Sequence, residues 1–130
     1  MRDVQHIGTI NIEIYQCVTQ DIKTEDVIIT PERIKHIKRH HPGDFEMFSQ
    51  YLKEIVERPD YILEANKPNT ALILKEIITD GKKFKLVLRL VTQFDHPNFK
   101  SSILTFMKID DKEWNRLRNN KKILYKADYL

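Results

Sequence analysis

The chain of 130 residues has few of the residues that cross-link or break a fold: one cysteine, three glycines and five prolines. A single cysteine excludes a disulfide framework and any cysteine-rich zinc site built from this sequence. Scarce glycine and proline, with no internal repeat or low-complexity segment, exclude a linker and a repetitive architecture. We therefore expect one domain over residues 1–130, long enough to bury a substantial core.

Long apolar runs and common enzyme motifs are also missing. No stretch reaches 18 apolar residues, so we expect no contact with a membrane. The opening MRDVQHIGTINIE lacks the order of a secretory signal, so we expect a cytoplasmic protein, in its own cell or delivered into a target cell. The absence of a glycine-rich phosphate loop, a nucleophile elbow and a dinucleotide fingerprint argues against the enzyme classes that use them.

A strong net charge is missing too, because 22 Lys and Arg face 19 Asp and Glu. A net charge of +3 is weak evidence for binding a polyanion. The charge is unevenly distributed, however. The segment RIKHIKRHH at 33–41 contains only positively charged and imidazole side chains besides its two isoleucines.

The apolar periodicity predicts an α+β fold. Alternating residues at 7–15 indicate a half-buried strand. Thr30 followed by Pro31 is typical of a helix start, and we expect this helix to end near residue 41, before Pro42 and Gly43. Asp44 should cap a second helix that ends at Arg58.

After residue 59 the pattern changes to a period of two residues. Short connections favour a roughly four-stranded antiparallel meander, with strands at 61–64, 70–78, 84–92 and 101–109. We expect a short C-terminal helix at 110–118 and a last edge strand at 123–125. Helices followed by strands predict two helices packed on one face of this sheet.

The helix expected at 31–41 carries the densest polar chemistry in the sequence. At 100° per residue, Ile34 and Ile37 define its buried stripe, and an adjoining flank carries Arg33, His36 and His40. The last turn returns the ring of His41 to the buried side, while Lys35 and Arg39 lie on the far side of the helix.

Imidazoles transfer protons near neutral pH, and neighbouring cations lower their pKa and attract phosphates. Cleavage of a phosphodiester beside a 2′-OH needs such a base, an acid and positive donors. Two alternatives remain open here. The histidines are also typical of a solvated surface cluster, or His36 and His40 could share a divalent metal ion, although the intervening residues are cationic and no His-Glu-x-x-His arrangement exists.

Polar residues that interrupt the apolar strand runs are candidate partners for the helix: Lys75, Arg89, Ser102 and Thr105. In the strand at 84–92 the large apolar residues share one face, which leaves Lys85, Val87 and Arg89 on the other. That second face would suit an RNA backbone, or it is an ordinary solvated sheet face.

Several short motifs occur in a fixed order: TPE at 30–32, HIxxxHP at 36–42, RPDYI at 58–62, strands bearing Lys75 and Arg89, SxxTF at 102–106 and KILYK at 122–126. This order resembles the nuclease domains of phages and mobile elements in the barnase–EndoU–colicin–RelE (BECR) superfold. The resemblance covers roughly residues 27–126 and leaves 1–26 as an N-terminal strand extension.

The resemblance implies a metal-independent endoribonuclease without a cofactor, and a role as a toxin or a phage or mobile-element effector. The substrate would be tRNA or another structured RNA, cut by transesterification at a 2′-OH. An immunity or antitoxin protein is an expected partner. Two alternatives stay open: a non-catalytic RNA- or protein-binding module on the same fold, and a RelE-like ribosome-dependent mRNA interferase that uses Lys and Arg.

The resemblance also implies roles for individual side chains. The catalytic pair falls on His36 and His41, and the doubled histidine makes His40 the alternative partner. The remaining assignments are Thr105 as a further catalytic residue, with phosphate or RNA binding by Arg33, Arg39, Lys75, Arg89 and Ser102.

Overall fold

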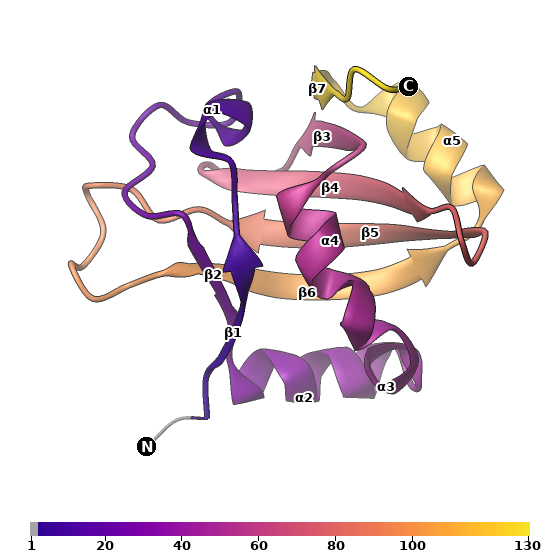
Figure 1. The fold of residues 1–130 in the computed structure, drawn as a ribbon, viewed down its shortest axis with the longest axis horizontal. Coiled ribbons are helices and arrows are strands. Elements are labelled where there is room, and N and C mark those ends of the chain that lie inside the picture. Colours follow the sequence, from indigo (N-terminus) through magenta and orange to yellow (C-terminus); the bar gives the residue numbers. More distant parts are fainter. Residues whose placement is uncertain (1–2) are drawn as a thin grey trace.

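One seven-stranded sheet runs through the molecule in the computed structural model, which describes residues 3–130 (Figure 1). Met1 and Arg2, the start of the expected N-terminal extension, lie outside the described residues. The strands are β1 Gln5–Thr9, β2 Asp26–Ile29, β3 Tyr61–Glu64, β4 Thr70–Ile77, β5 Lys82–Arg89, β6 Ser101–Ile109 and β7 Ile123–Lys126. The helices are α1 Ile12–Tyr15, α2 Pro31–His40, α3 Asp44–Phe48, α4 Leu52–Glu57 and α5 Asp111–Asn120, with a 3₁₀ turn η1 at Ser49–Tyr51.

The strand order is β1-β2-β6-β5-β4-β3-β7, so the α+β class is confirmed but the sheet is larger than the expected four strands. The expected antiparallel meander forms β3 to β6. At one edge β7 pairs with β3, as expected for residues 123–125. At the other edge β2 pairs in parallel with β6, joining Val27 to Ser101. Local patterns carry no signal for a pairing between segments so distant in the chain.

Helix α2 begins and ends where the sequence predicts. The Thr30 hydroxyl oxygen accepts a hydrogen bond from the backbone N–H of Arg33 at 3.3 Å, and Pro31 occupies the first turn. Ile37 is fully buried in the core, so the opposite side of the helix faces solvent. No helix among residues 3–130 is long and apolar enough to cross a membrane.

Two element predictions were wrong. The strand expected at 7–15 ends at Thr9, because Asn11 accepts the N–H of Glu13 at 3.0 Å and caps α1. The single helix expected at 44–58 is broken into α3, η1 and α4. Asp44 does not cap it through its side chain, because that carboxylate accepts the backbone N–H of Lys108 at 3.1 Å.

The two faces of the sheet differ in how they are covered. On one, the covered face, α4 lies across the strands and packs with Phe48 and Ile37 onto the core residues Phe84, Leu86 and Phe106 (Figure 1). On the other, the open face, α5 packs over one end of the sheet through Trp114 and Leu117. The rest of the open face is not covered by a helix of the described chain.

Candidate functional site

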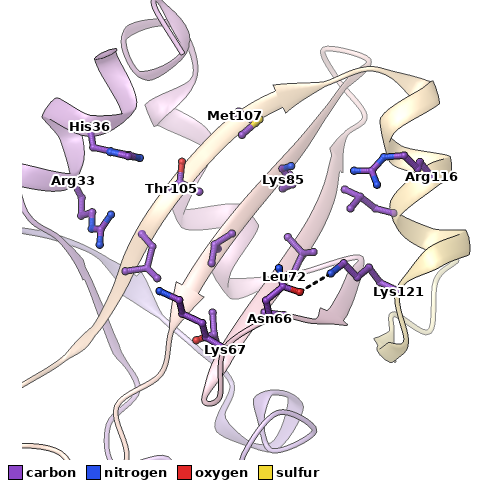
Figure 2. Close-up of a pocket in the computed structure, with 15 residues that line it drawn as sticks. Arg33, His36, Asn66, Lys67, Leu72, Lys85, Thr105, Met107, Arg116 and Lys121 are labelled. Carbon is purple, nitrogen blue, oxygen red and sulfur yellow. Dashed lines mark hydrogen bonds between the residues drawn. The ribbon is translucent and has the colours of Figure 1, made fainter. Parts of the chain in front are cut away.

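A trough of about 520 Å³ crosses the open face between α2 and α5 (Figure 2). Its floor is the sheet, one wall is α2, and the other wall is α5 with the β3–β4 connection. The lining residues are Arg33, His36, Ala65, Asn66, Lys67, Thr70, Leu72, Lys85, Val87, Leu104, Thr105, Met107, Arg116, Leu117 and Lys121.

The floor of the trough follows from the strand alternation. Lys85 and Val87 face the trough because Phe84, Leu86 and Leu88 turn to the core. On β6 the register shifts, so that Val87 pairs with Thr105 but Leu88 pairs with Ile103. The extra residue, Leu104, and its neighbour Thr105 both line the trough. Thr105 faces the trough because its pairing partner Val87 does, and the extra residue places Ser102, beyond it on β6, on the same open face.

The α2 wall presents His36 to the trough, and the exposed His40, which does not line the trough, lies against its ring. His36 is half-buried and extends from α2 towards Thr105 on β6 (Figure 2). The ring centroids of His36 and His40 are 4.3 Å apart, and His40 Nδ1 lies 3.1 Å from the carbonyl oxygen of His36. A carbonyl oxygen can only accept, so Nδ1 of His40 is the donor in this hydrogen bond, and Nε2 takes no part in it.

Partial burial lowers the pKa of the His36 imidazole below its ordinary value, and the positive charges of His40, Arg33, Arg39 and His41 lower it further. His36 is therefore neutral at neutral pH and able to accept a proton. This agrees with the expectation that cations around this helix depress an imidazole pKa.

Arg116 on the opposite wall and Lys85 on the floor form ion pairs with the same acid, Glu113. Arg116 donates from Nε and from a terminal nitrogen to the two carboxylate oxygens of Glu113, each at 2.7 Å, and Lys85 Nζ lies 3.5 Å from the same carboxylate. The hydrogen bond from Arg116 and the charge of Lys85 lower the pKa of Glu113. Lys121 donates to Asn66 at 3.0 Å (Figure 2).

Five lysine and arginine residues line the trough, and none of the described lining residues is acidic. A concave surface with one sign of charge concentrates the field, so phosphates should be attracted despite the small net charge. Of these five cations only Arg33 belongs to the predicted site, from which Lys67, Lys85, Arg116 and Lys121 were missing. The alternation at 84–92 is the signal that could have included Lys85, whereas the loop position of Lys67 carries no such signal.

The predicted residues Arg89 and Ser102 lie on the same open face but outside the trough, where they line a neighbouring hollow. They are register partners on β5 and β6. Arg89 forms an ion pair with Asp95 at 3.0 Å, so much of its charge is neutralised.

The structure separates Lys75 from the other predicted site residues. It is 5% exposed on the covered face, with Nζ 3.2 Å from Asp60 and 3.1 Å from the Tyr129 hydroxyl. Three further predicted residues, His40, His41 and Arg39, do not line the trough. His41 ends α2 with its N–H donating to Ile37, and Arg39 is exposed. His36, Thr105 and Arg33 are brought together, with His40 in contact with His36.

Within residues 3–130, no group of three or more His, Cys, Asp and Glu side chains is placed to hold a metal ion. The trough instead offers the His36 imidazole, the Thr105 hydroxyl and several cations. This set can exchange protons and bind a phosphate.

The comparisons with known proteins gave one match. The family model described as phage-Barnase-EndoU-ColicinE5/D-RelE like nuclease2 (PBECR2) matches residues 2–126. No curated protein and no solved structure matches the chain. The matched range includes β1 and α1, which the resemblance at the sequence level had left outside.

Proposed function

The chain belongs to the PBECR2 family of nuclease-like domains, and from that membership we propose that it is a metal-independent endoribonuclease with the trough as its active site. One observation carries the proposal. A half-buried His36 of lowered pKa extends towards Thr105 on the floor of the trough, in contact with a second imidazole and among cations.

The proposed reaction is transesterification within the RNA strand. Neutral His36 takes the proton of a 2′-OH, and the resulting oxyanion attacks the adjacent phosphorus. The bond to the 5′-oxygen breaks, and protonated His40 gives its proton to that leaving group. The products are a 2′,3′-cyclic phosphate and a 5′-OH. The Thr105 hydroxyl and the Arg33 and Lys85 cations stabilise the additional negative charge on the phosphoryl oxygens.

The proposed substrate is tRNA or another structured RNA. Cations stand on both sides of the trough, which suits a strand that presents several phosphates in succession. We also propose that the enzyme acts in the cytoplasm as a toxin or effector, and that an immunity or antitoxin protein blocks the trough.

The test is incubation of the purified protein with total tRNA in EDTA. We expect cleavage that leaves cyclic phosphate ends. His36→Ala should slow cleavage by about 10²–10⁴-fold, because it removes the general base, with unchanged circular dichroism and thermal unfolding. Lys35→Ala, at an exposed position of the same helix, is the matched control and should cut normally.

Other outcomes would replace the proposal. Binding of tRNA without cleavage would support a non-catalytic module, and cleavage only of mRNA on ribosomes would support a RelE-like interferase. Comparing His40→Ala with His41→Ala identifies the acid. The contact between rings predicts the larger loss for His40→Ala.

A further inference from the structure

The open face continues beyond the trough into a hollow of about 510 Å³. Both strands of the floor run from one into the other. On β5, Lys85 and Val87 line the trough and Arg89 lines the hollow, and on β6, Ser102 of the hollow precedes Leu104 of the trough. A strand of RNA lying in the trough would therefore reach this hollow if it followed the sheet.

An exposed aromatic ring borders the hollow. Phe99 is 59% exposed, and Val4, at 38%, also lines it. The His96 ring lies against Phe99 with centroids 5.4 Å apart. Lys100 lines the same hollow, and its ammonium lies 3.1 Å from Asp26 in an exposed ion pair. Such a pair is weak, so Lys100 can exchange Asp26 for a phosphate at little cost.

The loop that carries Phe99 is held in place. It joins β5 to β6 and extends beyond the end of the sheet (orange in Figure 1). The Asp95 carboxylate accepts the N–H of Thr92 at 2.8 Å and pairs with Arg89 at 3.0 Å. Lys23 donates to the carbonyl of Pro97 at 3.0 Å. These contacts hold the start and the middle of the loop, and the backbone N–H of Phe99 donates to the carbonyl of His96 at 3.0 Å, so the backbone that carries the exposed ring is already ordered for a ligand.

We propose that this hollow is a nucleotide subsite in which an unpaired RNA base stacks on Phe99. Lys100 and the Ser102 hydroxyl face the phosphate of that nucleotide. The proposal rests on the proposed function, because it places the subsite beside the scissile phosphate in the trough. Stacking on an aromatic ring requires an exposed base face, so the enzyme should prefer a cut site flanked by single-stranded RNA over a duplex.

The test is binding of a labelled single-stranded RNA decamer, measured by fluorescence anisotropy in EDTA. The His36→Ala protein is the parent, because it should bind RNA without cutting it. Adding Phe99→Ala should raise Kd by about five- to a hundred-fold, the loss expected for one stacked base. Phe99→Tyr should restore binding. Phe94→Ala is the matched control, because Phe94 is 82% exposed on the same loop but does not line the hollow.

The outcomes separate this inference from the proposed function. A change in Kd below two-fold for Phe99→Ala, in a protein that binds the decamer, overturns the subsite and leaves the nuclease proposal intact. Equal losses for Phe94→Ala and Phe99→Ala also overturn it. If the wild-type protein does not cut RNA but Phe99→Ala still weakens RNA binding, the nucleotide subsite is supported and the proposed nuclease activity is wrong. If the parent does not bind the decamer, the subsite proposal fails, and the cleavage of tRNA by the wild-type protein in EDTA decides the nuclease proposal separately.

Discussion

Two lysines on neighbouring strands, Lys75 and Lys85, show how differently the two faces of one sheet are used. The register pairs Lys75 with Phe84 and Leu74 with Lys85, so the two lysines are one step apart on opposite faces. On the covered face, Lys75 is 5% exposed beside Asp60. On the open face, Lys85 lines the trough and shares Glu113 with Arg116. Residue type and strand position are nearly the same, and the face alone separates a structural role from a proposed functional one.

The covered-face lysine forms a buried pair with Asp60, which the exposed Tyr129 joins from the surface. The carboxylate of Asp60 accepts from Lys75, from the Tyr129 hydroxyl at 2.6 Å, and from the backbone N–H of Glu76 at 2.8 Å. Burial alone would lower the pKa of Lys75, but the hydrogen bond to Tyr129 and the charge of Asp60 raise it. The cluster therefore ties β4 to the segment before β3 and to the C-terminal residues.

The largest expected effect comes from replacing the buried lysine of the covered face. Lys75→Met should lower the free energy of unfolding by about 3–5 kcal/mol, because it leaves the buried Asp60 charge without its cation. RNA cleavage per folded molecule should stay unchanged. Lys85→Met is the matched control: it should cost less than about 1 kcal/mol, since Arg116 remains with Glu113, but should weaken RNA binding. Urea unfolding and tRNA cleavage measure the two quantities.

The pH dependence of stability checks the same pair. Since the pKa of Lys75 is raised in the folded protein, its stabilisation is complete below the pKa of the unfolded chain and is lost as pH rises through the folded value. Wild-type protein should therefore lose stability above pH ~10, and Lys75→Met should lack this component. If Lys75→Met has the wild-type free energy of unfolding but does not cleave RNA, Lys75 contributes to RNA binding instead.

A smaller effect is expected from the acid on the open face. Glu113 forms ion pairs with Arg116 and Lys85, so Glu113→Gln should leave both cations available to bind phosphates. RNA binding should tighten several-fold at low salt, and the slope of log K against log salt should steepen by about 0.7 for each cation that gains a phosphate on single strands. Glu64→Gln, an exposed acid outside the trough lining, is the control. An unchanged slope would contradict the proposed role of this wall.

The smallest effect concerns the pH profile of cleavage. Arg33 is one of the cations that lower the pKa of His36, so Arg33→Gln should raise that pKa. The acidic limb of kcat/KM reports the base of the free enzyme and should move to higher pH. Lys38→Gln lies on the same helix but pairs with Glu46, and it should leave the limb in place. If the acidic limb lies at the same pH in the wild-type and Arg33→Gln proteins, His36 is not the base.

The sequence predicted those parts of the molecule that depend on local patterns. Helix α2 is delimited by the residues next to it, Thr30 as its N-terminal cap and Pro42 and Gly43 after its end. The strict alternation of β5 assigns Lys85 to the open face. The position of Lys75 could not be predicted in this way. Strand β4 is apolar on both sides of the sheet, so its pattern does not distinguish the faces, and only the register with β5 does.

The candidate site could be predicted on one wall only. His36 and Arg33 share a flank of one helix, a fact contained in their spacing. The second wall depends on α5 packing over the sheet, which brings Arg116 and Lys121 opposite α2. No local signal reports such an arrangement. Thr105 was identified as a candidate, but that it faces the trough beside Val87 follows only from the pairing of β5 with β6.

The parallel pairing of β2 with β6 has a consequence for the order of events during synthesis. Helix α2 follows directly after β2, and β2 joins the antiparallel strands of the meander by pairing with β6, where Val27 pairs with Ser101. Residues 31–40 leave the ribosome long before residues 101–109. The histidines of α2 are therefore synthesised before β6, the strand of the trough floor next to them, exists. Thr105 and His36 come together only after most of the chain has been translated. A growing chain therefore lacks the assembled site while it is still attached to the ribosome that is making β6.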